Sequence, residues 1–281
     1  MNFKRFLLSR MSTATKGKLK KKIQTTKKKL KFWVRPLTLS QMKHVLCVDL
    51  GISAGDKIFI TSAFGALNAQ FSPFDLVKLL MEIVTPDGMI LMPYYPPGTS
   101  AEWADSGVVF DMQKTKSAMG VVTNVFSNME NVHKSIHPTK SIVGWGNGIE
   151  DLLEGHESTI TPFSADSPYG KFLKLKGSKS IGLGVGKFPM GHCMEDIVSE
   201  KLTHYRKERI IMKVKTYNNE INVSSLVHDE NRGQIPPIDF IKSCKYYKKV
   251  KVGYEYCFVI DNVKAYEFYK QQFTNGNPSF W

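Results

Sequence analysis

An imidazole and a carboxylate lie three residues apart in the segment GLGVGKFPMGHCMED, residues 182–196. Positions i and i+3 are neighbours on a helix surface, so His192 and Glu195 would share one face of a helix that begins near Met190. A carboxylate beside an imidazole fixes its tautomer and stabilises the imidazolium. The spacing predicts a general base at His192, oriented by Glu195; the alternative is a satisfied surface histidine.

Three other chemistries are weaker for this segment. A carboxylate di-metal site needs two Glu-x-x-His pairs and further carboxylates, whereas one His-x-x-Glu is present, so we expect no metal. Cys193 would project about 100° from its helical neighbours and is expected to pack; it becomes a candidate nucleophile only in a loop. The glycines of GLGVG do not open a helix with GxxG spacing, which favours a strand with close backbone approach over a nucleotide site.

Serines, a threonine and a second histidine occur in three short segments that are candidates for binding a ligand. TSAFG (61–65) and KSAMG (116–120) each place a serine at an expected strand end or helix start, where backbone N–H groups can bind a carbonyl or phosphate oxygen. HPTKS (137–141) places His, Thr and Ser around a turn stiffened by proline. A purely structural role is the more common outcome for the histidine of such a turn.

The elements that would position these residues begin at residue 55. The segment 55–67 predicts a strand that ends in a tight loop at Ser62-Ala63. A helix is predicted over 72–84, with Ser72 as N-cap and Pro73 in its first position. A buried strand follows at 88–95, and strand, helix, strand is the order typical of an α/β layer.

Later segments continue this pattern and then change it. Residues 96–116 show no periodicity and predict a long loop, a candidate lid. A helix with Ser117 as N-cap is expected over 117–129, and a short strand within 135–146. Further elements are expected as helices at 147–155 and 167–175, a strand at 179–185, a hairpin over 209–225 turning at Asn218-Asn219, a strand at 250–260 and a helix at 261–273. The predicted fold is α/β, with a mixed central sheet flanked by helices and a C-terminal α+β extension.

The net charge of +14 is concentrated at one end of the chain. Of the 39 basic residues, thirteen lie in residues 1–35, which contain no Asp or Glu; 26 basic and 25 acidic residues follow. We therefore predict a basic N-terminal arm, 1–35, and a single domain, 36–281. The arm is expected to be a solvated tail, with binding to an anionic membrane surface as the alternative. Nucleic acid is not an expected partner, because no aromatic-interleaved repeat accompanies the lysines.

Cysteine usage and hydropathy indicate a compartment. The four cysteines form no CxxC pair, which argues against a disulfide framework or a zinc ribbon. No secretory leader and no run of 18 or more apolar residues is found in the sequence. We expect a cytoplasmic protein, peripheral at the inner membrane face if the arm binds lipid.

In combination and in order, these segments resemble the aminoglycoside 3-N-acetyltransferase family over nearly all of residues 36–281. The HSSL-like turn of the family is matched by GDKIFITSAFGAL, its PSxMG-like segment by KSAMG, and its RSxHPxxSxxAxG-like segment by HKSIHPTKSIVGWG. SPYGKF matches an SPxGKL-like segment, and His192 with Glu195 matches HxxE. The chain departs from the family at Thr61, Ala63 and Pro189, where the family has His, Ser and Thr.

The resemblance implies transfer of an acetyl group from acetyl-CoA directly to an amine, with His192 as general base and Glu195 as its orienter. It implies that acetyl-CoA lies along two small-residue segments and the His-Pro turn, with backbone amides polarising the thioester oxygen. The residues concerned are Ser62, Ala63, Ser117, Met119, Gly120, His137, Thr139 and Ser141.

The charge of the domain is the basis for predicting the acceptor. An aminoglycoside is a polycation and favours a cleft with carboxylates, whereas a nucleotide-linked amino sugar favours Lys, Arg or helix N-termini. The domain after the arm is nearly neutral, and the basic arm fits work near anionic lipid. We therefore predict a nucleotide-linked amino sugar of surface polysaccharide biosynthesis as acceptor, with an aminoglycoside antibiotic as the alternative. A basic-tailed nucleic-acid-binding protein is the alternative from another class.

Overall fold

The computed structural model describes residues 35–199, 202, 204–228 and 246–275. The chain divides into two units, of which the second begins at Leu37. The predicted arm, 1–35, lies outside the described residues except for Arg35, so its boundary and its role stay predictions. No helix in the described ranges combines the length and the apolar character that crossing a bilayer requires.

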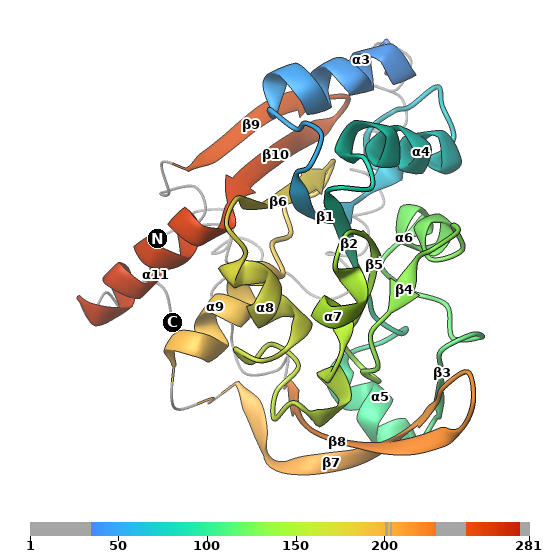
Figure 1. The fold of residues 1–281 in the computed structure, drawn as a ribbon, viewed down its shortest axis with the longest axis vertical. Coiled ribbons are helices and arrows are strands. Elements are labelled where there is room, and N and C mark those ends of the chain that lie inside the picture. Colours follow the sequence, from blue (N-terminus) through green and yellow to red (C-terminus); the bar gives the residue numbers. More distant parts are fainter. Residues whose placement is uncertain (1–34, 200–201, 203, 229–245, 276–281) are drawn as a thin grey trace, which may run out of the picture. The chain divides into compact units, whose positions relative to one another are not determined.

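A seven-stranded mixed sheet forms the centre of this unit, in the order β4-β5-β2-β1-β6-β10-β9 (Figure 1). Its middle three strands, β2, β1 and β6, are parallel, and the strands on both sides are antiparallel to their neighbours. The bounds are β1 Lys57–Ser62, β2 Met89–Tyr94, β4 His133–Lys134, β5 Ser141–Gly146, β6 Ser178–Leu183, β9 Tyr247–Val252 and β10 Glu255–Asp261.

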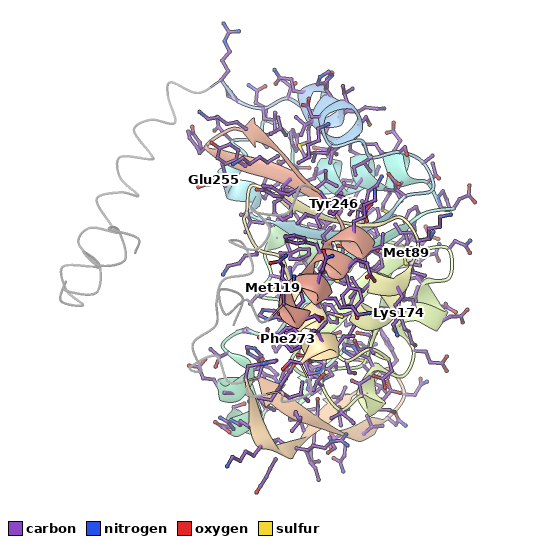
Figure 2. All side chains as sticks on the ribbon, turned by 90° about the vertical axis from the view of Figure 1, so that its left-hand side faces the viewer. Met89, Met119, Lys174, Tyr246, Glu255 and Phe273 are labelled. Carbon is purple, nitrogen blue, oxygen red and sulfur yellow. The ribbon has the colours of Figure 1, made fainter. Side chains whose placement is uncertain are left out.

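Helices cover both faces of this sheet. Alternation along β1 sends Ile58 and Ile60 into one buried cluster and Phe59 into another, as expected for a strand buried on two sides. The first cluster includes α3 (Leu39–His44), α4 (Pro73–Val84) and α6 (Val121–Phe126). The second includes α7 (Ile149–Leu153), α8 (Pro168–Lys174), α9 (Met190–Val198) and α11 (Asn262–Thr274). Figure 2 shows α11 on the outside of this layer, with Phe273 near its C-terminal end.

A smaller sheet lies beyond the carboxyl ends of the parallel strands and is built in the order β3-β7-β8 (Figure 1). Its long members, β7 (Tyr205–Lys215) and β8 (Glu220–His228), form the hairpin that was predicted over 209–225. The third strand is β3 (Phe110–Asp111), which pairs in parallel with β7. The predicted fold class is confirmed.

Local sequence signals explain the elements that were predicted well. Ser72 accepts from the backbone N–H of Asp75, whose side chain accepts from Ser72 in return, so α4 starts with a capping box. Asp261 caps α11 in the same direction by accepting from Lys264 N. Gly182 in β6 permits close approach, because a Cβ there would overlap the ring of Phe258. The interpretation of GLGVG as a strand is therefore confirmed for Gly182 and Leu183 only, because β6 ends at Leu183 and Gly184 takes φ 69°.

The prediction of an unstructured loop over 96–116 is wrong. This segment contains α5 (Ser100–Ser106) and then β3. Thr99 and Glu102 form a capping box at the start of α5, a signal that the sequence carried and the prediction did not use. The helix is only seven residues long, so the segment offered too few turns for a periodicity to show.

Two further predictions are corrected. Ser117 is not a helix N-cap, because α6 begins at Val121 after Gly120. Residues 250–260 are not one strand but parts of β9 and β10, which form a hairpin around Gly253 at φ 58°. The lack of a two-residue Asn-Gly or Asp-Gly signal hid this turn in VKVGYEY.

Candidate active site

The three parallel strands bring their carboxyl ends to one edge of the sheet, where open α/β sheets usually bind ligands. A cavity of about 620 Å³ lies at this edge. Its walls come from the ends of β1 and β2, the loops after Tyr95 and before β5, and the segment that leads into α9. The described lining residues are Thr61, Ser62, Pro93, Tyr95, Ala118, Met119, Lys140, Phe163, Val185, Gly186, Lys187, Phe188, Pro189 and His192.

His192 lies in the first turn of α9 and reaches the wall of this cavity. Its side chain is 24% exposed, and the Nδ1 atom lies 3.8 Å from Oε2 of Glu195. This Nδ1 is buried and has no hydrogen-bond partner among the described residues. Phe163 and His228 flank the ring, with centroid distances of 5.4 and 5.3 Å. The predicted i, i+3 pair is therefore on one helix face, within reach of closing to a hydrogen bond.

Glu195 is a partly buried carboxylate among three imidazoles. Burial raises its pKa, but the neighbouring His192, His204 and His228 lower it by more, and the net pKa lies below its ordinary value. The side chain is therefore ionised at neutral pH. In this state it can accept a hydrogen bond from a protonated Nδ1 of His192. Glu195 can orient this imidazole and stabilise its charged form.

The sequence analysis missed four residues beside this pair. Asp196 is buried, and its Oδ2 accepts from the hydroxyls of Thr161 at 2.6 Å and Tyr205 at 2.7 Å. His204 lies 2.8 Å from Asp196 Oδ1 through its Nε2. Asp196 lies on α9 next to Glu195, His204 and Tyr205 follow that helix at the start of β7, and Thr161 comes from the loop before α8. Adjacency to Glu195 was a usable signal for Asp196, and none existed for the others.

Of the eight residues predicted to contact acetyl-CoA, four line one of two neighbouring hollows, and Ala63, His137, Thr139 and Ser141 line neither. Ser62 and Met119 line the cavity beside His192. Ser117 and Gly120 line a neighbouring hollow of about 830 Å³, and Ala118 belongs to both walls. Lysines 114, 116 and 134 are the described charged residues of this second wall. Burial lowers the pKa of Lys134 to about 8, and its Nζ lies 3.8 Å from the centre of the Tyr94 ring.

The segment 117–120 is a loop shaped by one side chain. Asn124 accepts from the backbone N–H of Ser117 and donates to the carbonyl oxygens of Ser117 and Gly120. Gly120 takes φ 105°, which favours glycine there. The amide of Met119 donates to Ser117 Oγ, and that of Ala63 to Leu183 O. These two amides are thus already engaged within the protein, although both residues stay predicted contacts of the thioester.

The His-Pro turn is buried and is held by its own polar atoms. His137 Nδ1 faces the backbone N–H groups of Thr139 and Lys140, at 3.3 and 3.1 Å. Burial, followed by the charges of His156 and Lys140, lowers its pKa well below the ordinary value, so the ring is neutral. Ser141 donates to Ser135 O at 2.6 Å. His137, Thr139 and Ser141 do not line the cavity; they hold the turn that places Lys140 in its wall.

Thr61, which occupies the position where the family has His, forms a hydrogen bond with the segment before α9. Its hydroxyl donates to Lys187 O at 3.0 Å. Lys187 and Lys140 both line the cavity, and Lys140 Nζ lies 4.5 Å from the centre of the Tyr95 ring. The described cavity wall therefore carries two lysines and His192, and it carries no carboxylate.

Cys193 is fully buried among apolar side chains of α8, α9 and α11. Burial raises the pKa of its thiol well above the ordinary value. Nucleophilic chemistry uses the thiolate, so this position does not suit a nucleophile. Cys193 lies on α9 rather than in a loop, as the packing interpretation required.

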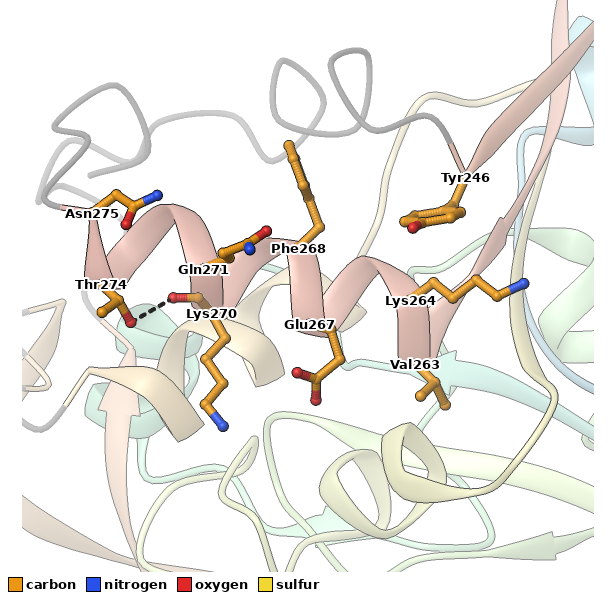
Figure 3. A pocket seen from close by; sticks show the side chains of 9 residues that line it. All are labelled: Tyr246, Val263, Lys264, Glu267, Phe268, Lys270, Gln271, Thr274 and Asn275. Atoms are coloured by element: carbon orange, nitrogen blue, oxygen red, sulfur yellow. Dashed lines mark hydrogen bonds between the residues drawn. The ribbon is translucent and has the colours of Figure 1, made fainter.

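Other parts of the described surface offer less chemistry. A hollow beside Tyr246 and α11 contains one carboxylate, Glu267, and neither His nor Cys in its described wall (Figure 3). Within the described ranges, no group of three or more His, Cys, Asp or Glu side chains is arranged to hold a metal ion. Another hollow, of about 730 Å³, is lined by His133 and Glu150, whose side chains pair at 3.2 Å but are 40% and 73% exposed. The cavity at His192 differs because its histidine and the neighbouring carboxylate are less exposed and lie at the carboxyl ends of the parallel strands.

Comparison with known proteins decides the family. The model of the family described as aminoglycoside 3-N-acetyltransferase matches residues 60–274. The chain belongs to the aminoglycoside 3-N-acetyltransferase family. The resemblance noted from the motifs is confirmed, and the family is one of acetyl-CoA-dependent N-acetyltransferases.

Two relatives share less than 25% of their residues with this chain. The SPbeta prophage-derived aminoglycoside N(3')-acetyltransferase-like protein YokD of Bacillus subtilis (strain 168) is 24% identical over 172 residues, which span 54% of this chain and 62% of YokD. Among solved structures, aminoglycoside acetyltransferase AAC(3)-Xa has a TM-score of 0.73 at 18% identity, over 89% of this chain and 96% of that one.

Two further solved members of the family carry ligands. AAC-IIIb, solved as a binary complex with CoASH, has a TM-score of 0.71 at 17% identity, over 86% of this chain and 98% of that one. AAC-VIa, solved with sisomicin, has a TM-score of 0.71 at 19% identity, over 87% and 100% of the two chains. At these identities the likeness establishes the fold.

Proposed function

We propose that this chain transfers an acetyl group from acetyl-CoA to the primary amine of an amino sugar, with His192 as the general base and Glu195 as its orienter. The observation that carries the proposal is the placement of His192. Its imidazole lies in the wall of the cavity at the carboxyl edge of the sheet, and the ionised Glu195 lies behind it. Family membership supports the same reaction.

In the proposed reaction, the amine nitrogen attacks the carbonyl carbon of the thioester. The C–N bond forms, His192 accepts the proton that the amine loses, and Glu195 stabilises the imidazolium. The C–S bond then breaks, and the proton goes from His192 to the departing sulfur, so that CoA leaves as a thiol. The transfer is direct and uses no acyl-enzyme, which agrees with the buried, high-pKa thiol of Cys193.

Acetyl-CoA fits the two adjoining hollows that meet at Ala118. The part beside Ser62, Met119 and His192 would take the acetyl group and the pantetheine arm. The part beside Ser117 and Gly120 would take the phosphates, because three lysines line it and phosphate is stabilised by nearby cations. The CoASH complex of AAC-IIIb supports CoA as the co-substrate of the family. We propose no metal in this reaction.

An aminoglycoside is the first candidate for the acceptor. The support is the naming of the family and of YokD, and the sisomicin complex of AAC-VIa. AAC-VIa binds sisomicin, a polycationic amino sugar, and YokD is named as similar to an aminoglycoside acetyltransferase. The geometry at His192 requires of the acceptor only one unprotonated amine that can reach the cavity.

A nucleotide-linked amino sugar is the second candidate, and one observation favours it. The described wall of the cavity at His192 contains Lys140 and Lys187 and no carboxylate. A polycation gains nothing from such a wall, whereas a diphosphate does. The strongly basic segment 1–35 supports work beside anionic lipid of the inner membrane face, as surface polysaccharide assembly requires. On this proposal the protein is cytoplasmic and peripheral.

The test is a thiol-release assay with acetyl-CoA and the full chain, run against aminoglycosides and nucleotide-linked amino sugars. Turnover with an aminoglycoside assigns the first candidate, and turnover with a nucleotide sugar assigns the second. Product identification by mass spectrometry must show one acetyl group on an amine. Acetyl transfer to neither class, at concentrations where CoA binding is saturated, would overturn the proposed function.

A further inference from the structure

One imidazole contacts both adjacent carboxylates of α9. The ring of His204 places Nδ1 3.7 Å from Glu195 Oε1 and Nε2 2.8 Å from Asp196 Oδ1. The His204 side chain is 8% exposed, and those of Glu195 and Asp196 are 21% and 1% exposed. His204 is therefore a buried bridge between the carboxylate behind His192 and a second carboxylate deeper in the protein.

The deeper carboxylate is a fixed anchor. Asp196 Oδ2 accepts from Thr161 Oγ1 and from Tyr205 Oη, while its Oδ1 faces His204. Three donors from two parts of the chain, Thr161 and the adjacent His204 and Tyr205, thus hold one carboxylate. Both hydroxyls already use Oδ2, so Oδ1 is left for the ring, and Nε2 of His204 is a donor. A proton on Nε2 is fixed by this arrangement.

The charges around His204 favour a second proton, on Nδ1. Burial lowers the pKa of His204, but the hydrogen bond with Asp196 and the charges of Glu195 and Asp196 raise it by more, so that the net pKa is raised. Among the described residues, the other titratable groups facing the cluster are His192 and Cys193 of α9, Tyr205 of β7, His228 of β8 and Tyr269 of α11. The nearest opposite charges are the two carboxylates, and an imidazolium is their natural partner.

The two oxygens of Glu195 consequently face different imidazoles. Oε1 faces His204, and Oε2 faces the buried Nδ1 of His192. When an ion pair with His204 fixes Oε1, the orientation of the Glu195 carboxylate is defined, and so is the direction of Oε2. With Nδ1 of His192 turned to Oε2, its Nε2 is the nitrogen that can accept a proton from a substrate.

We infer that His204 is a positioning residue: anchored on Asp196, its imidazolium holds Glu195 ionised and directs Oε2 at Nδ1 of His192. This inference rests on the proposed function, since it concerns how the base is prepared. His204 does not line the cavity, so it acts through Glu195 and not on the substrate. Each group thus orients the next: Asp196 orients His204, His204 orients Glu195, and Glu195 orients His192, which contacts the acceptor amine.

The substitution His204→Gln tests this inference, because it keeps a donor for Asp196 and removes the positive charge. We expect kcat to fall at least about tenfold, with little change in the KM for acetyl-CoA, because the base is still present but poorly oriented. The acid limb of kcat/KM should move to higher pH, since Glu195 loses a cation that lowers its pKa. A merely structural role would not move that limb.

The matched control is His133→Gln. His133 is also paired with a carboxylate, at 3.2 Å from Glu150 Oε1, but it lies on β4 with 40% of its side chain exposed. Its replacement should leave kcat and the pH profile unchanged. Unchanged kcat and an unmoved acid limb in a folded His204→Gln protein would overturn the inference. If His192→Ala is inactive at the same time, the proposed function still stands.

A second measurement uses His204 itself, in case the variant does not fold. Ring signals of the histidines in the labelled full chain can be titrated by NMR. We expect His204 to titrate above 6.5, the ordinary value for histidine, and to titrate lower in Glu195→Gln. A His204 signal that titrates below 6.5, or that does not respond to Glu195→Gln, would overturn the inference.

Discussion

Tyr205→Phe removes one hydroxyl from the anchor of the site and should destabilise the protein measurably. Tyr205 is 2% exposed, and its Oη donates to Asp196 Oδ2 at 2.7 Å. The substitution deletes a single oxygen atom and leaves the ring and its packing in place. The expected loss is therefore that of one hydrogen bond to a carboxylate, about 1.5–3 kcal/mol.

The assay is thermal and urea unfolding of the full chain. A loss near 2 kcal/mol corresponds to a fall in Tm of about 4–8 °C for a domain of this size. Tyr217→Phe is the matched control, because Tyr217 is 62% exposed, and it should change the free energy of unfolding by less than about 0.5 kcal/mol. Thr161→Val removes the other hydroxyl on the same oxygen, so the two substitutions should not be additive.

The reasoning would be refuted by a Tyr205→Phe protein that unfolds like the wild type. That result would mean that the hydroxyl gains as much from water in the unfolded chain as from Asp196 in the fold. Additive losses in the double variant would also count against a shared anchor, because both hydroxyls donate to one oxygen.

Two further predictions follow from the same cluster. Cys193→Ala should lower Tm, because the buried thiol packs in the core, and it should keep kcat within about threefold, because the thiol takes no part in the proposed direct transfer. Loss of turnover in a folded variant would argue for an acyl-enzyme. The raised pKa of His204 contributes stability that is fully present below about 6.5 and is lost as pH rises through the folded-state value, so urea unfolding at a series of pH values should show this decrease in the wild type. His204→Gln should lack that decrease, and an equal decrease in both proteins would assign it to another group.

Local patterns were enough to predict the central layers of the fold. Ser72, Pro73 and the apolar face behind them predicted α4, and the β-branched runs predicted the parallel strands beside it. Periodicity failed where elements were short. The seven-residue α5 was taken for loop, and the Gly253 turn was taken for the middle of a strand, because neither spans enough residues to reveal its period.

The site was predictable only as far as it is local in sequence. His192 and Glu195 lie within one turn of α9, so their spacing alone predicted a shared face. The bridge from Glu195 to Asp196 depends on His204 and Tyr205, which reach α9 through tertiary packing of the hairpin that begins at β7. Such contacts have no spacing rule in a single sequence, because chain folding and not helical periodicity brings them together.

The most direct test of the account is kcat of His192→Gln compared with the wild type, on whichever acceptor gives turnover with acetyl-CoA. Calorimetric titration with CoA should accompany it, to show that the variant still binds the co-substrate. The account predicts a fall in kcat of about 10²- to 10⁴-fold, the usual contribution of a general base, with the Kd for CoA unchanged. Turnover of a correctly folded His192→Gln protein at close to the wild-type rate would contradict it.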